Sequence, residues 1–220
     1  MKIKSIHQIE ITSRCNLRCK YCAHPTMTRT KKDMSFDVFK QAIKVCKTLY
    51  DKNGWGELNL CGIGESTLHP EFAEFILYAR RVLGENISLV LATNGVGVTQ
   101  EHANILKVAN VKTWVSLHRP EKAAGAVNLM RDAKILHGVS VDASISSVNW
   151  AGQISWPVTA QSTPCKWLEK GLVFITADGD VTQCSFDGNG VGVKANVFDE
   201  NLLDFEIEPY ELCKTCHMTY

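Results

Sequence analysis

The chain has 220 residues, of which 45% are hydrophobic and 21% are charged, so it is a globular protein long enough to bury a sizeable core. The net charge of +1 gives no sign of a polyanion-binding surface, which argues against nucleic acid as an obligatory partner but leaves a nucleotide substrate open. No apolar run approaches the ~20 residues of a membrane span and no signal peptide is visible, so we expect a cytoplasmic protein whose nine cysteines serve mainly as metal ligands.

A strand-like run at residues 7–12 leads directly into a cysteine-rich loop. The three cysteines of this loop are Cys15, Cys19 and Cys22. Cysteines so close together are poorly placed to form a disulfide, but their thiolates can hold one face of an iron–sulfur cube. Three thiolates leave one iron without a local protein ligand, and an open coordination position is typical of a catalytic metal. A structural zinc loop with a distant fourth ligand is the alternative.

Three basic side chains flank these cysteines: Arg14, Arg18 and Lys20. Positive charge beside a thiol stabilises the thiolate, which is the form that binds metal. The sequence therefore predicts that the three cysteines are easily deprotonated.

A helix is predicted over residues 35–50, where a serine stands at the N-cap position and apolar side chains recur at helical spacing. Cys46 lies on this apolar face, so we expect it in the core. The next strand, at residues 57–61, leads into the sequence Gly-Ile-Gly-Glu at residues 62–65. Two glycines there allow the backbone to approach a ligand closely, although a plain strand–helix turn is the alternative. Cys61 is expected to pack in the strand.

Three further helix–strand repeats follow. The predicted helices cover residues 70–83, 100–109 and 120–137, and the predicted strands cover residues 87–93, 111–117 and 139–145. This alternation predicts a parallel sheet with right-handed crossovers. Polar residues stand where two strands end, at Thr93 and Asn94 and at Ser116 and His118. Because barrel active sites lie at the carboxyl ends of parallel strands, these positions favour a curved partial barrel over an open doubly wound sheet.

A second group of cysteines lies near the C-terminus: Cys165, Cys184, Cys213 and Cys216. Short strand-like runs at residues 172–176 and 180–184 flank Ala177-Asp178-Gly179, which is a hairpin signal. A short helix is predicted to begin near Pro209. Four cysteines around a hairpin fit a zinc ribbon, and they also fit a fully ligated iron–sulfur cluster.

The first cysteine loop, Cys-x3-Cys-x-aromatic-Cys with Tyr21 in the aromatic place, resembles the signature of the radical S-adenosylmethionine (SAM) enzymes. The resemblance implies that Cys15, Cys19 and Cys22 hold a [4Fe–4S] cluster whose fourth iron is chelated by SAM. It also implies that one electron from the cluster cleaves SAM to a 5′-deoxyadenosyl radical, which abstracts hydrogen from a substrate.

Residues 62–65 resemble the glycine-rich SAM motif of the same family, which is usually Gly-Gly-Glu-Pro. The chain departs from that motif because Ile63 separates the glycines and Ser66 stands in the place of proline. In the family, the acidic side chain contacts the methionyl amine, which implies this role for Glu65. The SAM-binding residues implied by the resemblance are Tyr21, Gly62, Gly64, Glu65, Thr93, Asn94 and Ser116. His118 is the candidate for substrate contact.

The resemblance further implies a partial (β/α)6-type barrel over residues 1–150, shortened after its fifth strand. Residues 151–164 are then a linker or the last barrel strand. Residues 165–220 resemble a "twitch" domain, a shortened SPASM domain in which four cysteines hold an auxiliary [4Fe–4S] cluster.

The implied function is an enzyme that abstracts hydrogen from a small-molecule, nucleotide-derived, amino-acid-derived or peptide substrate. Oxidation, rearrangement or crosslinking would result, with electrons from a protein such as flavodoxin or ferredoxin. Two alternatives from other classes stay open. One is a non-catalytic two-cluster electron-transfer or iron–sulfur sensor protein, and the other is a zinc-stabilised binding protein.

Overall fold

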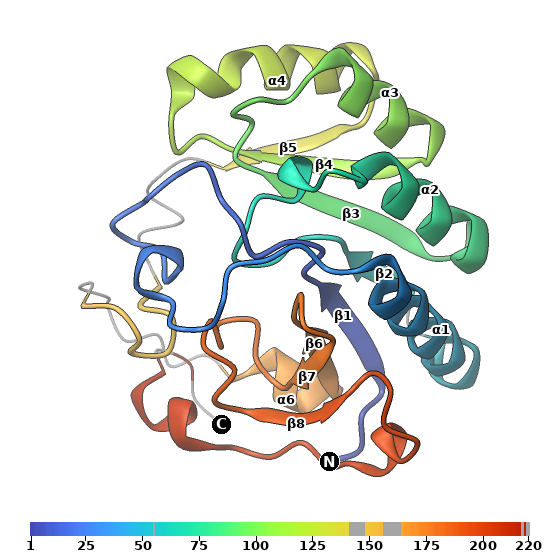
Figure 1. Ribbon diagram of the computed structural model, residues 1–220, viewed down its shortest axis with the longest axis vertical. Coiled ribbons are helices and arrows are strands. Elements are labelled where there is room, and N and C mark those ends of the chain that lie inside the picture. Colours follow the sequence, from blue (N-terminus) through green and yellow to red (C-terminus); the bar gives the residue numbers. More distant parts are fainter. Residues whose placement is uncertain (55, 141–147, 156–163, 217, 219–220) are drawn as a thin grey trace.

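The computed structural model describes residues 1–54, 56–140, 148–155, 164–216 and 218 (Figure 1). Its strands form one sheet in the order β5-β4-β3-β2-β1-β6-β7-β8. The bounds are β1 Ser5–Ile9, β2 Glu57–Asn59, β3 Ser88–Thr93, β4 Val111–Ser116, β5 Leu136–Ser140, β6 Leu172–Ile175, β7 Asp180–Thr182 and β8 Val193–Asn196. The strands β5, β4, β3, β2, β1 and β6 are parallel to one another. The pairings of β6 with β7 and of β7 with β8 are antiparallel. The predicted α/β class with a partial parallel sheet is confirmed.

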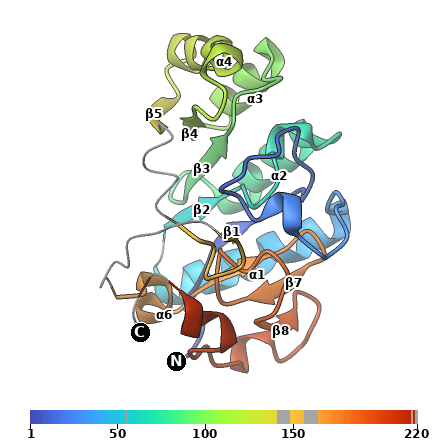
Figure 2. The ribbon, with the colours of Figure 1, turned by 90° about the vertical axis from the view of Figure 1, so that its left-hand side faces the viewer.

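Helices α1 to α4 line one side of the sheet (Figure 1). The bounds of the described helices are α1 Phe36–Asn53, α2 Phe72–Leu83, α3 Gln100–Val108, α4 Pro120–Asp132 and α6 Lys166–Lys170, and those of the short 3-10 helices are η1 His24–Thr26, η2 Ser66–Leu68, η3 Leu202–Asp204 and η4 Glu211–Thr215. Figure 2 shows the strands descending from β5 to β1 and then to β7 and β8. No helix among the described residues has the length and apolar character that crossing a membrane requires.

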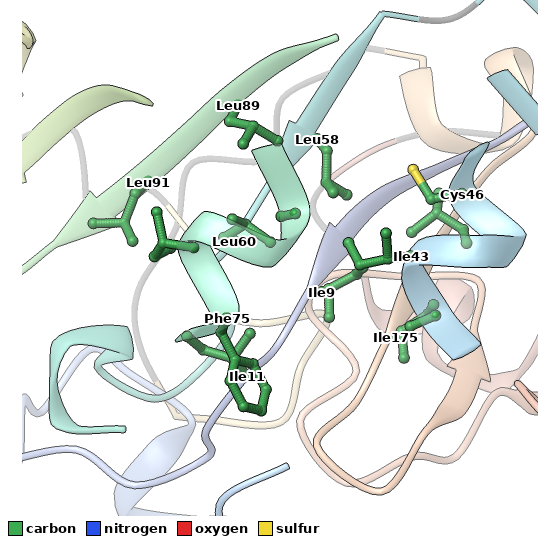
Figure 3. Close-up of a cluster of buried hydrophobic side chains, with 14 of the residues drawn as sticks. Ile9, Ile11, Ile43, Cys46, Leu58, Leu60, Phe75, Leu89, Leu91 and Ile175 are labelled. Atoms are coloured by element: carbon green, nitrogen blue, oxygen red, sulfur yellow. The ribbon is translucent and has the colours of Figure 1, made fainter. Parts of the chain in front are cut away.

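The core lies between this helical layer and the sheet. Strands β1 to β3 and β6 turn apolar side chains toward α1 and α2, and Figure 3 labels ten of the residues involved. Helix α1 begins where the predicted N-cap, Ser35, accepts a hydrogen bond from the Val38 N–H at 3.4 Å. Its buried face includes Cys46, which is 4% exposed, so the predicted core position of this cysteine is confirmed.

Removing this buried thiol tests whether Cys46 only packs in the core or also binds iron. Cys46→Ala is expected to lower the free energy of unfolding by about 1–2 kcal/mol, because it leaves a small cavity in the core. The iron and sulfide content of anaerobically prepared protein should not change. Thermal unfolding and iron analysis measure the two effects. Loss of a whole cluster from a variant that lacks both Cys46 and Cys61 would contradict the ligand assignment.

The end of α4 differs from the prediction. The sequence placed the helix end at Gly138, but α4 ends at Asp132 and β5 already begins at Leu136. Lys134 adopts the left-handed backbone conformation with a φ of 61°, which stops the helix. Gly138 instead lies within β5 beneath an aromatic ring, since a Cβ there would be 2.9 Å from Trp114 Cη2. Residues 141–145 of the predicted strand lie outside the described residues.

The C-terminal hairpin joins the same sheet as the rest of the chain. Strand β6 pairs in parallel with β1, from Ser5 opposite Leu172 to Ile9 opposite Ile175, and β7 returns antiparallel after Gly179 with a φ of 84°. The hairpin is as predicted, but its first strand covers the edge of β1. The division into a barrel and a small appended domain stays a prediction. Of the segment predicted as a linker or last strand, residues 156–163 lie outside the described residues.

Candidate active site

A cavity of about 210 Å³ lies beside the loops that follow β1 to β4. It is lined by every residue that the sequence assigned to the barrel rim, namely Cys15, Cys19, Tyr21, Cys22, Gly62, Gly64, Glu65, Thr93, Asn94, Ser116 and His118. These residues come from four separate strand ends, so only the folded sheet brings them together. Their roles in binding a cluster, SAM or substrate remain predictions, whereas their convergence on one cavity is a property of the structure.

Backbone N–H groups point at two of the three thiols. The Leu17 N–H donates to Cys15 Sγ and the His24 N–H donates to Cys22 Sγ, each at 3.4 Å. Burial nevertheless raises the pKa of Cys15, and it raises the pKa of Cys22 to about 11. Arg14 is exposed and lies 3.5 Å from Asp33, so its charge is directed away from the sulfurs.

For Cys15 and Cys22 the prediction that the flanking cations favour the thiolate is therefore wrong, because burial raises the pKa of both thiols. Arg18 and Lys20 are exposed as well, and burial outweighs the charges around the loop. Thiols with raised pKa values bind metal by releasing protons, so assembly of a metal centre here is favoured by higher pH.

Glu65 connects the loop after β2 to the end of β3. Its carboxylate, 2% exposed, accepts hydrogen bonds from the Thr93 hydroxyl at 2.7 Å and the Asn94 N–H at 2.7 Å, and from both donors of Thr67. Burial raises the pKa of Glu65, and these hydrogen bonds oppose that shift. The side chain is held in one orientation at the cavity wall, which is the condition for a specific contact with a ligand amine.

The glycines on either side of Ile63 allow close contacts with protein as well as with a ligand. A Cβ on Gly64 would lie 2.6 Å from the carbonyl oxygen of Arg14, and the Glu65 N–H donates to the same oxygen at 2.7 Å. The loop at residues 62–65 is thus attached directly to the backbone that carries Cys15. This contact explains why the chain needs glycine at position 64.

Asn94 fastens the end of β3 to the cysteine loop. Its side-chain oxygen accepts from the Val96 N–H at 2.8 Å, and its Nδ2 donates to Asn16 Oδ1 at 2.8 Å. The Asn94 side chain thus closes the turn that follows β3. At the end of β4, Ser116 Oγ accepts from Ser140 Oγ at 3.0 Å.

Tyr21 and His118 form a pair across the cavity. The Tyr21 hydroxyl lies 2.9 Å from His118 Nδ1, which joins the cysteine loop to the end of β4. Trp150 also lines the cavity, and its Nε1 donates to the Tyr21 carbonyl oxygen at 2.8 Å. Sequence reasoning missed Trp150, because nothing local indicates a contact 129 residues away in the chain.

Two further residues, Cys61 and His24, line the cavity although the sequence did not place them there. Cys61 was expected to pack within a strand, but it follows β2 and lines the cavity, where burial raises its pKa to about 11. His24 follows the cysteine loop and begins the 3-10 helix η1. It is 6% exposed, its Nε2 lies 3.1 Å from the Ser13 carbonyl oxygen, and its buried Nδ1 has no hydrogen-bond partner among the described residues.

The four C-terminal cysteines also meet at one place. A second, smaller cavity is lined by Cys165, Cys184, Cys213 and Cys216. Gln183 Nε2 and the Tyr210 hydroxyl border the same cavity; the Gln183 amide nitrogen is buried without a hydrogen-bond partner among the described residues, and the Tyr210 hydroxyl faces Cys184. Burial raises the pKa of Cys184 to about 12, and it also raises that of Tyr210, which therefore stays a hydrogen-bond donor. Four sulfurs, one unused amide donor and a tyrosine hydroxyl directed at a thiol fit an anionic sulfur-rich group.

A single metal ion fits neither group of cysteines as they stand. In the part of the chain that the structure describes, no three Cys, His, Asp or Glu side chains are close enough to share one ion. Thiolates that bind an iron–sulfur cluster are each attached to a different iron, so they stand further apart than the ligands of one zinc ion.

Replacing the buried carboxylate tests the proposed ligand contact. Glu65→Gln is expected to weaken SAM binding about tenfold, because the amide removes a charge and places a donor where the carboxylate accepts. Iron content should stay at the wild-type level. Calorimetric titration of anaerobic protein measures the affinity, and Glu74→Gln, on the exposed face of α2, is the control. An unchanged SAM affinity would contradict the role assigned to Glu65.

Comparison with known proteins agrees with this geometry. The model of the radical SAM superfamily matches residues 9–118, half of the chain. The tungsten-containing aldehyde ferredoxin oxidoreductase cofactor-modifying protein of Pyrococcus furiosus is 38% identical over 96 residues, which are 42% of this chain and 24% of the relative. The PqqA peptide cyclase of Streptomyces rochei is 32% identical over 119 residues, 53% of this chain and 30% of the relative. The matches thus span about a quarter to a third of these curated relatives.

Among solved structures, BtrN in complex with AdoMet and 2-DOIA superposes with a TM-score of 0.77 at 19% identity, covering 93% of this chain and 84% of that chain. At this level of identity the likeness demonstrates a shared fold.

Proposed function

The chain belongs to the radical SAM superfamily, and we propose that it is an enzyme that cleaves SAM reductively and abstracts hydrogen from a bound substrate. The family implies a [4Fe–4S] cluster and SAM as cofactors. When bound, they supply one-electron cleavage of SAM and the radical that abstracts hydrogen. The single observation that carries the proposal is the convergence of all rim residues predicted from the motifs on one cavity.

The residues of the chain have distinct tasks in this proposal. Cys15, Cys19 and Cys22 would hold the cluster, and the N–H groups directed at their sulfurs would stabilise the thiolates. Glu65, whose carboxylate is held by hydrogen bonds from Thr93 and Asn94, would accept a hydrogen bond from the methionyl amine. Aromatic side chains at Tyr21 and Trp150 line the same cavity and would help to exclude water from a reactive intermediate.

We also propose an auxiliary [4Fe–4S] cluster at the C-terminal cysteines, as in a twitch domain. The support is the meeting of four cysteines in one cavity with the unused Gln183 amide donor and the Tyr210 hydroxyl. Such a cluster would accept or relay an electron during turnover. The physiological reductant would be an electron carrier such as flavodoxin or ferredoxin, and exposed basic residues beside the first cysteine loop, among them Arg18 and Lys20, suit an acidic partner.

The names of the relatives point to several classes of substrate. One relative is a peptide cyclase and another is a GTP 3′,8-cyclase, and the similar BtrN structure contains 2-DOIA. We therefore propose a peptide, a nucleotide or another small molecule as substrate, altered by oxidation, rearrangement or crosslinking.

The deciding experiment is a search for 5′-deoxyadenosine. Anaerobically purified protein is incubated with SAM and dithionite, and the products are analysed by mass spectrometry, with reactions lacking dithionite as the control. We expect a brown protein that releases 5′-deoxyadenosine only with the reductant. A protein that contains clusters but leaves SAM intact would support the electron-transfer alternative, and a colourless protein containing zinc would support the zinc alternative.

A further inference from the structure

A buried carboxylate outside the family motifs connects three segments of the chain. Glu10 follows β1 and is 3% exposed. Its Oε2 accepts from the Ile63 N–H at 3.0 Å, within the loop at residues 62–65. Its Oε1 accepts from the Ala177 N–H at 3.2 Å, in the turn between β6 and β7, and from Arg29 Nη2 at 2.5 Å.

Arg29 extends this connection into the C-terminal part of the chain. Its side chain is 13% exposed, and its Nε donates to the Gly188 carbonyl oxygen at 2.7 Å. Its Nη1 lies 3.9 Å from Asp178 in the β6–β7 turn. One buried ion pair therefore joins the segment after the first cysteine loop, the loop at 62–65 and two loops of the C-terminal hairpin region.

Side-chain packing reinforces the same connection. A Cβ on Gly62 would lie 2.7 Å from Glu10 Oε2, so only glycine leaves room for the carboxylate. Ile63, the residue that interrupts the glycine motif, is 7% exposed, and a Cβ on Gly188 would lie 2.7 Å from its Cδ1. The inserted isoleucine is thus packed over the C-terminal loop that Arg29 also holds.

We propose that Glu10 and Arg29 are positioning residues that set the SAM affinity of the loop at 62–65 and make it depend on the C-terminal segment. This inference rests on the proposed function of that loop. A carboxylate that accepts from Ile63 and Ala177 at once ties their two backbones together. Removing its charge leaves buried donors without an acceptor and frees both.

The test begins with Glu10→Gln. A glutamine has one acceptor oxygen, so its amide N–H₂ faces either the Ile63 N–H or the donors of Ala177 and Arg29. We expect the SAM dissociation constant, measured by calorimetry on reconstituted protein, to rise about tenfold while the iron content stays unchanged. Hydrogen exchange at the Ile63 and Ala177 amides, followed by mass spectrometry, should accelerate together.

Lys32→Met is the matched control. Lys32 Nζ pairs with Asp178 at 2.8 Å and so connects the segment after the cysteines to the same turn, but its ammonium makes no hydrogen bond or ion pair with residues 62–65 in the part of the chain that the structure describes. It should lower stability slightly and leave the SAM dissociation constant within twofold of wild type. An equal loss of affinity in Lys32→Met and Glu10→Gln would overturn the proposal, because general loosening would then be sufficient.

A comparison of a conservative with a non-conservative variant of Arg29 separates a positioning role from a role in folding. Arg29→Lys keeps a cation beside Glu10 and should retain most of the SAM affinity, whereas Arg29→Met should lose it about as far as Glu10→Gln does. This comparison also serves if Glu10→Gln does not fold. Equal affinities in the two Arg29 variants would overturn the proposal.

SAM binding by the wild-type protein, together with amide exchange in the variants, distinguishes this inference from the proposed function. If wild-type protein did not bind SAM, the proposed function would fail. Coupled acceleration at Ile63 and Ala177 in the Glu10 and Arg29 variants would then still support positioning of the loop, and independent exchange at the two amides would overturn it.

Discussion

Replacing Cys15, Cys19 and Cys22 together with alanine is expected to abolish the reductive cleavage of SAM. The three thiols line the candidate SAM cavity, and without them no protein ligand in the loop remains to hold a cluster. The expected result is no 5′-deoxyadenosine above the level of the reaction without reductant, together with the loss of about four irons per chain. Product analysis by mass spectrometry and iron determination measure both.

The control for this triple variant is Cys46→Ala, because Cys46 is buried in the core away from both cavities. It should keep wild-type iron content and full SAM cleavage. Continued release of 5′-deoxyadenosine by the triple variant would show that another site cleaves SAM, and it would remove the first cysteine loop from the mechanism.

Replacing Cys213 and Cys216 with alanine is expected to remove the auxiliary cluster while the first one remains. These cysteines lie on and just after η4, and two of four thiolates hold a cluster poorly. We expect iron content to fall by about half, substrate turnover to be lost and 5′-deoxyadenosine to form still with a strong reductant. Iron analysis and electron paramagnetic resonance of the reduced protein measure the loss.

Lys214→Ala is the matched control, since Lys214 lies between the two cysteines and its exposed ammonium pairs with Glu211 at 2.7 Å. It should retain both clusters. If the double variant converted substrate at the wild-type rate, the auxiliary cluster would have no catalytic part, and a structural role for the C-terminal cysteines would replace it.

The helix cap, the hairpin turn and the cysteine spacing of this protein could be predicted from its sequence. The cap at Ser35, the hairpin around Gly179 and the spacing of Cys15 and Cys22 each depend on residues close together in the chain. Periodicity and turn chemistry encode such features directly. The rim residues followed for the same reason, because each stands at the end of a recognisable strand and parallel strands end together.

The end of α4 was misplaced because a local signal was interpreted without its tertiary neighbours. Gly138 carries the usual signal for a helix end, and its actual role is to lie beneath Trp114 on the neighbouring strand. The thiol pKa values were misjudged in the same way, because sequence displays the charges of Arg14, Arg18 and Lys20 but not the burial that outweighs them.

The sequence by itself determined the alternation of strands and helices from β1 to β5, the hairpin of β6 and β7, the two groups of cysteines and the strand ends that carry the rim residues. Only the tertiary structure decided that β6 covers the edge of β1, that Trp150 reaches Tyr21, and that Glu10 and Arg29 tie the loop at 62–65 to the C-terminal hairpin. The physical reason is that strand pairing and buried hydrogen bonds join residues that are distant in the chain, 129 positions apart for Trp150 and Tyr21 and 53 for Ile63 and Glu10. Such partners are chosen by shape, burial and the satisfaction of every buried polar group, none of which leaves a local pattern.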